Sequence, residues 1–195
     1  MGRLADLDAV TIDALGTLIR LRSPVARLAE LGGVSEEAAR RGFEAEVAYY
    51  VPRSTEGRDA ASLAELRDRC TAVFNEAAGA SLGRDEFMSA IEFEPEPGAL
   101  ETVRRLQALG LALCVVSNWD CALPEHLARL GIDLEVVTSA EAGAAKPDPR
   151  VFRVALERLG VEPARALHVG DSPEDEEGAR AAGMRFAPAP LESLL

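Results

Sequence analysis

The sequence predicts a doubly wound, Rossmann-like α/β domain with a helical segment inserted after its first strand. From residue 98 onward, apolar runs typical of buried parallel strands alternate with amphipathic helical patterns. One more strand-like run, AVTID, lies about 80 residues before this region. The residues between them carry helical spacing and no strand signals. Together these observations indicate a parallel sheet whose first strand is separated from the others by helices.

The elements follow in order along the chain. We expect the first strand over residues 8–13 and inserted helices over 23–31, 35–50, 62–78 and 84–91. Helices over 98–110, 123–130, 148–159 and 173–182 then alternate with strands over 111–118, 134–138, 164–171 and 184–189. The predicted domains are an α/β core of residues 1–18 and 95–195 and a helical domain of residues 19–94. Ligands of such a sheet bind at the carboxyl ends of its strands.

The composition is that of a globular protein, which we expect to fold alone and to be cytoplasmic. The chain has 195 residues, of which 48% are hydrophobic and 28% charged, and its net charge of -12 argues against nucleic acid as a partner. The longest apolar run, over residues 109–116, is far shorter than the roughly 20 residues of a membrane helix. Three cysteines without metal-site spacing predict reduced thiols. The oligomeric state is not indicated.

Polar side chains follow three of the predicted strands. Asp13 ends the first strand, Ser117 and Asn118 end the strand LALCVVSN, and Asp171 ends the strand ARALHVGD. We expect these ends to converge, and two carboxylates in one closed site repel each other unless a cation lies between them. Carboxylates, waters and a substrate phosphate are the oxygen ligands that Mg²⁺ prefers. The sequence therefore predicts a magnesium and phosphate site.

Two further segments contribute to the predicted anion site. Gly16 and Thr17 are expected to form a tight turn whose free N–H groups bind a phosphoryl oxygen, and Ser117 adds a hydroxyl donor. Lys146, in GAAKPDP, is the one lysine beside 20 arginines. A compact ammonium at this position suits a phosphate site, although a surface lysine without a role explains it equally well.

Four short stretches in this order resemble the haloacid dehalogenase superfamily over nearly the whole chain. They are D13-A-L-G-T17-L, S117-N-W-D, K146-P-D-P and G170-D-S-P-E-D175. The wording TIDALGTL and KPDPRVF looks closest to the branch named for rhythmically expressed gene proteins. The inserted helices are similar in position to the helical cap of this superfamily.

The resemblance implies a Mg²⁺-dependent phosphatase of small phosphorylated molecules. It implies that Asp13 is the nucleophile and forms an aspartyl-phosphate, and that Lys146 also offsets the charge of the carboxylates. The implied metal ligands are Asp13, the Leu15 carbonyl and Asp171, with Asp175 in a supporting position, and the implied phosphate-binding residues are Gly16, Thr17, Ser117, Asn118 and Lys146.

Leu15 departs from the pattern of these phosphatases, which carry an Asp at this position. That Asp protonates the leaving oxygen and activates water, so its loss predicts impaired or altered proton transfer. Two alternatives stay open: a 2-haloacid dehalogenase, although those enzymes typically have Tyr here and lack the pair Gly170 and Asp171, and a phospho-ligand-binding protein without turnover. Asp120 is either a substitute acid or a helix cap.

Other polar and aromatic residues have open or structural interpretations. Trp119 either walls the pocket or packs in the core, and both histidines, His126 and His168, are expected to be structural because neither ends a strand. Four residues of the helical segment are possible pocket residues: Tyr49, Tyr50, Arg53 and Arg58.

Overall fold

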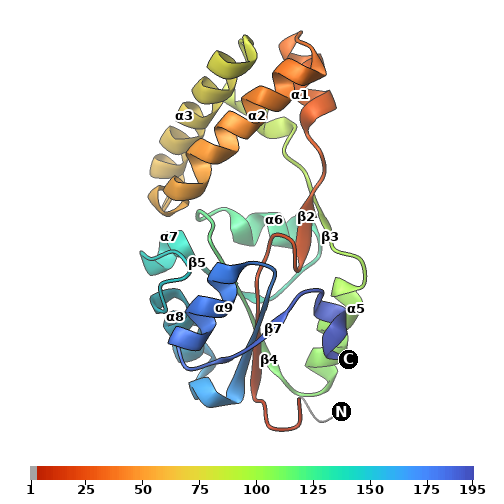
Figure 1. Ribbon diagram of the computed structural model, residues 1–195, viewed down its shortest axis with the longest axis vertical. Coiled ribbons are helices and arrows are strands. Elements are labelled where there is room, and N and C mark those ends of the chain that lie inside the picture. The colour runs from red at the N-terminus through yellow and green to blue at the C-terminus, as the bar shows by residue number, and fades with distance from the viewer. Residues whose placement is uncertain (1–3) are drawn as a thin grey trace. The chain divides into compact units, whose positions relative to one another are not determined.

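The computed structural model describes residues 4–195 and contains a five-stranded parallel sheet in the order β5-β4-β1-β6-β7 (Figure 1). The strands are β1 (Ala9–Ile12), β4 (Ala112–Ser117), β5 (Glu135–Thr138), β6 (Ala166–Gly170) and β7 (Arg185–Pro188). Each lies within a predicted strand, so the predicted doubly wound α/β fold is confirmed.

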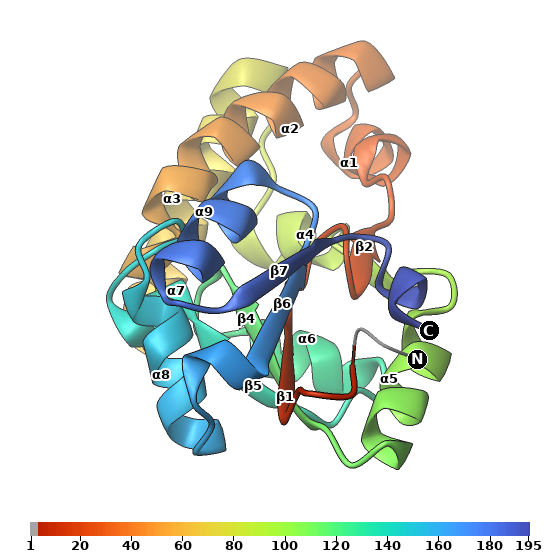
Figure 2. The same cartoon turned by 60° about the horizontal axis from the view of Figure 1, so that its bottom comes forward.

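Helices cover both faces of this sheet. They are α5 (Ala99–Ala108), α6 (Leu123–Arg129), α7 (Ser139–Ala142), α8 (Arg150–Leu159) and α9 (Pro173–Ala181), with short 3-10 turns η2 (Pro163–Arg165) and η3 (Leu191–Leu194). Figure 2 shows α8 and α9 on one side of the sheet and α5 and α6 on the other. Because both faces are covered, every residue of β1 and of β6 is buried, as their apolar runs require.

The strand order changes direction between β1 and β6. The chain leaves β1 toward β4 on one side, whereas it leaves β6 toward β7 on the other side. Loops that diverge from neighbouring strands in this way leave an opening at the strands' carboxyl ends, where doubly wound proteins bind ligands. Asp13 and Asp171 are the residues that directly follow β1 and β6.

The chain forms two compact units, one of the residues up to Arg20 with Glu94–Leu195 and the other of Leu21–Phe93. The second unit contains α1 (Val25–Gly32), α2 (Glu36–Tyr50), η1 (Val51–Glu56), α3 (Ala60–Ala78) and α4 (Arg84–Ser89). Gly42 lets α2 approach α3 closely, since a Cβ there would lie 2.7 Å from the Ala78 Cβ. No helix within residues 4–195 is long and apolar enough to cross a membrane.

Two strands lie in the segment that was predicted to be purely helical. β2 (Ile19–Leu21) and β3 (Phe93–Pro95) pair where the chain leaves and re-enters the α/β unit. Arg20 and Arg22 form ion pairs with Glu94 and Glu92, respectively, at N–O distances of 2.7 and 2.8 Å. The prediction of helices alone was therefore wrong at the two ends of the segment, because strands of three residues are too short to give a periodic signal.

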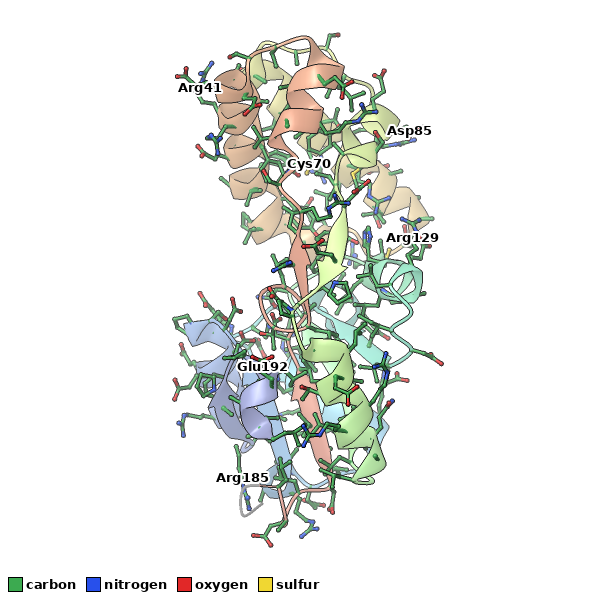
Figure 3. All side chains as sticks on the ribbon, turned by 90° about the vertical axis from the view of Figure 1, so that its right-hand side faces the viewer. Arg41, Cys70, Asp85, Arg129, Arg185 and Glu192 are labelled. Carbon is green, nitrogen blue, oxygen red and sulfur yellow. The ribbon has the colours of Figure 1, made fainter. Side chains whose placement is uncertain are left out.

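The helical unit buries a carboxyl group, Glu46 of α2, which is only 8% exposed. Burial raises the pKa of Glu46 to about 7, and a hydrogen bond with the thiol of Cys70 offsets only part of this effect. Figure 3 marks Cys70 among the side chains of this unit. Near pH 6, Glu46 is therefore protonated in the folded chain and ionised in the unfolded chain.

Glu46 makes folding stability fall as the pH rises from about 5 to about 7. The folded chain binds the proton more tightly than the unfolded chain, so ionisation above the ordinary pKa costs up to about 3 kcal/mol of unfolding free energy. Denaturant titrations at several pH values should show this fall in the native chain and not in Glu46→Gln. Glu44→Gln, an exposed change on the same helix, is the control and should keep the native slope.

Candidate functional site

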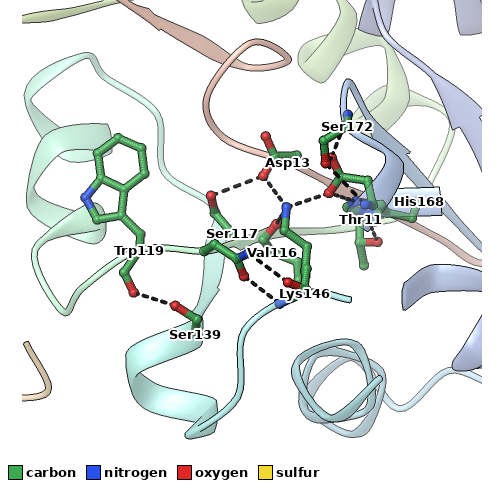
Figure 4. A network of polar contacts seen from close by, with 11 residues as sticks. Thr11, Asp13, Val116, Ser117, Trp119, Ser139, Lys146, His168 and Ser172 are labelled. Atoms are coloured by element: carbon green, nitrogen blue, oxygen red, sulfur yellow. Dashed lines mark hydrogen bonds and ion pairs between the residues drawn. The ribbon is translucent and has the colours of Figure 1, made fainter. Parts of the chain in front are cut away.

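The carboxyl ends of β1, β4 and β6 bring the predicted polar side chains together. Ser117, the last residue of β4, donates a hydrogen bond from its hydroxyl to Asp13 Oδ1 over 3.1 Å. Carboxylate oxygens of Asp13, Asp171 and Asp175 all lie within 4.8 Å of one another. Figure 4 shows Asp13, Ser117 and Lys146 facing one another at this point.

Lys146 is the buried cation of the site, with 7% of its surface exposed. Its Nζ donates to Asp13 Oδ1, to Asp175 Oδ1 and, over 3.3 Å, to the carbonyl of Val116. Burial by itself lowers the pKa of Lys146, but the charges of Asp13 and Asp175 outweigh burial and hold the pKa above its usual value. Lys146 is therefore an ammonium between two carboxylates, and the interpretation as a surface lysine is wrong.

Asn118 fixes the loop that carries Lys146. Its side-chain carbonyl accepts the N–H of Lys146 over 2.6 Å, and its amide donates to the Lys146 carbonyl over 3.1 Å. These two hydrogen bonds connect the end of β4 to a residue 28 positions later in the chain. In this structure the Asn118 side chain therefore acts on Lys146, whereas the sequence suggested that it binds phosphate directly.

Asp175 accepts four hydrogen bonds. Its Oδ1 accepts from Lys146 Nζ and from His168 Nε2 at 3.0 Å, and its Oδ2 accepts from the backbone N–H of Ser172 at 3.1 Å and from the Ser172 hydroxyl at 2.7 Å. Burial by itself raises the pKa of Asp175, but the hydrogen bond from His168 and the charge of Lys146 lower it below its usual range. A carboxylate with about four acceptor sites is thereby fully engaged.

Asp171 is the exposed carboxylate of the group. Partial burial and then the charges of Asp13 and Asp175 raise the pKa of Asp171, because each makes its ionised form less favourable. Three carboxylates meet a single ammonium, that of Lys146, so these four side chains carry a net charge of −2 when all are ionised. A divalent cation with oxygen ligands fits this donor set and charge.

The turn after Asp13 differs from its predicted role in one respect. Gly16 has φ +84°, and a Cβ there would lie 2.3 Å from Asp171 Oδ2, so only glycine fits. Its N–H donates to the Ile19 carbonyl over 2.8 Å. The Thr17 N–H donates to the Ala14 carbonyl over a longer distance of 3.5 Å. The expectation of free N–H groups on Gly16 and Thr17 was therefore wrong, because both take part in closing the turn. The Thr17 hydroxyl is buried and has no hydrogen-bond partner among residues 4–195.

Leu15 is exposed, with 45% of its surface accessible. Asp120 instead is buried, and its Oδ1 accepts the N–H of Ala122, the residue before α6, over 2.8 Å. This contact forms a local turn in front of α6, whose N-cap residue is Ala122 without a side-chain cap, so the predicted helix-capping role of Asp120 was wrong. Trp119 is also buried, with its ring 6.1 Å from that of His126, which favours the packing interpretation.

Two of the predicted pocket residues of the helical unit, Tyr49 and Arg53, contact each other. The Arg53 guanidinium lies 4.0 Å from the centre of the Tyr49 ring and donates to the Tyr49 carbonyl over 2.9 Å. Tyr50 is half-buried and Arg58 exposed. Whether any of these residues meets a substrate stays a prediction.

Sequence reasoning missed the residues that hold Asp175. Ser172 and Asp175 form a capping box at the start of α9, and the spacing S172-P-E-D175 is the signal that could have revealed it. His168 contacts Asp175 and, through Nδ1, the Thr11 hydroxyl at 2.8 Å. Thr11 and His168 carry no such local signal, since they lie 157 residues apart in the sequence.

Comparisons with known proteins agree with this fold. A family model described as haloacid dehalogenase-like hydrolase matches residues 7–183. The chain is 34% identical to haloacid dehalogenase-like hydrolase domain-containing protein 3 of Bos taurus, over 98% of this chain and 87% of that protein. Among solved structures, it is similar to a dehalogenase (TM-score 0.73, 28% identity, 93% of this chain and 84% of that chain) and to a HAD phosphatase from Thermococcus onnurineus (TM-score 0.63, 26% identity, 92% and 85%). The chain belongs to the haloacid dehalogenase-like hydrolase family.

Proposed function

We propose that this hydrolase is a Mg²⁺-dependent phosphatase of small phosphorylated molecules and that Asp13 is its nucleophile. The observation that carries the proposal is the buried Asp13–Lys146 pair beside Asp171. A fixed carboxylate, a fixed ammonium and an excess of negative charge thus lie together at the carboxyl ends of the strands. A phosphoryl group requires a nucleophile and cationic partners in the same place.

The proposed metal ligands are Asp13, Asp171 and the main-chain carbonyl of Leu15. Asp175 supports the site from behind, because its acceptor positions are occupied by Lys146, His168 and Ser172. When bound, Mg²⁺ would neutralise charge on the phosphoryl oxygens and offset the repulsion between the carboxylates. Leu15 leaves this ligand set intact, since the proposed ligand at position 15 is a backbone atom.

The side chains around Asp13 define its part in the reaction. Ser117 and Lys146 both donate to Oδ1, so we assign Oδ2 as the oxygen that attacks phosphorus. A bond forms between Oδ2 and phosphorus while the bond from phosphorus to the leaving oxygen breaks. Lys146 and Ser117 remain beside the transferring group and stabilise its charge, with Thr17 as a further hydroxyl donor.

Leu15 determines which leaving groups the site can expel. Its hydrocarbon side chain stands where a carboxyl group would protonate the leaving oxygen. A leaving group that is stable as an anion needs no such proton. We therefore infer that aryl and acyl phosphates are turned over and that phosphates of ordinary alcohols are poor substrates.

The test is release of nitrophenolate and phosphate from p-nitrophenyl phosphate. We expect slow multiple turnover that is abolished by a chelator and restored by added Mg²⁺. The similarity to a dehalogenase is tested in parallel with 2-chloropropionate. Chelator-insensitive halide release without phosphatase activity would replace the proposal with a dehalogenase. Calorimetric binding of inorganic phosphate without any turnover would replace it with a binding protein.

A further inference from the structure

We propose that Thr11 and His168 are positioning residues of the active site, which hold Asp175, and through Asp175 the Lys146 ammonium, against Asp13. The inference rests on the proposed function, because it assigns a role in the reaction of Asp13. Neither residue reaches the substrate. Their effect passes through a buried chain of hydrogen bonds, which we call the Thr11–His168 relay.

The sheet register builds the relay. Thr11 of β1 and His168 of β6 are paired across the two central strands, and both side chains are fully buried. The Thr11 hydroxyl lies 2.8 Å from His168 Nδ1, and His168 Nε2 lies 3.0 Å from Asp175 Oδ1 (Figure 4). Lys146 Nζ contacts that same oxygen of Asp175 and also Asp13. The relay therefore leads from the sheet interior to the nucleophile.

The partners of Asp175 fix the direction of every hydrogen bond in the relay. Lys146 and Ser172 already donate to Asp175, which is therefore an ionised acceptor, so His168 Nε2 must carry a proton. Burial lowers the pKa of His168, which favours the neutral imidazole, and a neutral ring with its proton on Nε2 has Nδ1 as an acceptor. The Thr11 hydroxyl must then donate to Nδ1. Its hydrogen bond satisfies Nδ1 in the tautomer that Asp175 requires.

The Thr11 hydroxyl is the polar group that, together with Asp175, orients the His168 ring. The ring of Phe152 meets the His168 ring edge-on, with centroids 4.9 Å apart, and Phe186 lies on a neighbouring strand with its ring centroid 6.4 Å away. These apolar contacts hold the ring plane but do not distinguish its two nitrogens. Without the hydroxyl, Nδ1 would be a buried acceptor with no donor, and the ring would lose the contact that directs Nε2–H toward Asp175. Asp175 would then be held less firmly against the Lys146 ammonium.

The test compares Thr11→Val, which keeps the shape and removes the hydroxyl, with Thr11→Ser, which keeps the hydroxyl. We expect kcat for p-nitrophenyl phosphate to fall about 10- to 100-fold in Thr11→Val, as is usual when an outer-shell partner is lost, with little change in KM. Thr11→Ser should stay close to the native rate. Loss in both variants, or in neither, would overturn the relay, because the hydroxyl would then not be the group that matters.

A second measurement reads the tautomer without relying on activity. The chain has two histidines, so ¹⁵N-histidine spectra of the native chain and of His126→Gln assign the His168 ring. The relay requires a proton on Nε2 of the native chain. A native ring protonated on Nδ1 would overturn the inference even if Thr11→Val failed to fold. If the native chain hydrolysed no phosphate, the proposed function would fail, whereas the spectra would still decide whether the relay exists.

Discussion

Asp13→Asn is expected to lower the rate of aryl phosphate hydrolysis by more than about 10³-fold, because the neutral amide has no anionic oxygen with which to attack phosphorus. The fold should survive the change. The amide oxygen can still accept from Ser117 and Lys146, and Lys146 keeps its contact with Asp175. The measurement is steady-state hydrolysis of p-nitrophenyl phosphate with Mg²⁺ at matched protein concentrations.

A phosphate mimic separates loss of the nucleophile from general damage to the site. Beryllium fluoride binds to an ionised Asp as a mimic of a phosphoryl group and, with Mg²⁺, should raise the melting temperature of the native chain but not of Asp13→Asn. Inorganic phosphate should still bind to the variant through Lys146 and Ser117. Undiminished hydrolysis by Asp13→Asn would mean that another group, or a contaminating enzyme, carries the activity.

Leu15→Asp is expected to raise hydrolysis of an alkyl phosphate by about 10²- to 10⁴-fold, the usual contribution of a positioned acid or base. The new carboxyl group would protonate the alkoxide leaving group and then activate water against the aspartyl-phosphate. Aryl phosphates need only the second of these actions, so their rate should rise less. Because Leu15 is exposed, a charged side chain at this position costs little stability.

Leu15→Asn is the matched control, since it has nearly the same size and polarity as Asp but transfers no proton. A rapid burst of nitrophenolate before slow turnover is expected in the native chain and in Leu15→Asn, whereas Leu15→Asp should lose the burst as water attack becomes faster. Equal rates for the Asp and Asn variants on both substrates would show that position 15 is not where proton transfer occurs.

Most of the fold could be predicted because its signals are local and long enough to repeat. The buried strand β4 is a continuous apolar run, and α8 has an amphipathic pattern that ends at Gly160. The strands β2 and β3 were not predicted, because three residues contain little more than one alternation of apolar and charged side chains. Their cross-strand pairs, such as Arg20 with Glu94, connect residues 74 positions apart and become visible only when the strands are paired.

The positions of Asp13 and Asp171 in the candidate site could be predicted, because each residue directly follows a strand with a clear apolar pattern. The contact of His168 with Asp175 was not predicted, because a histidine inside a strand is usually a packing residue. The role that we propose for it depends on Thr11 being opposite it in the register, and strand order cannot be taken from composition. At Gly16 the sequence predicted the tight turn correctly. It could not predict the hydrogen-bond partner of the Gly16 N–H, because that partner depends on how the turn closes.

The burial of Lys146 also determines how the chain meets amine-directed chemistry. The other 20 basic side chains are arginines, and the one ε-amine lies between two carboxylates with 7% of its surface exposed. Acylating reagents and amine cross-linkers therefore find no ε-amine on the folded surface. Modification of Lys146 requires its contacts with Asp13 and Asp175 to open, so the extent of acylation measures how often the site is disassembled.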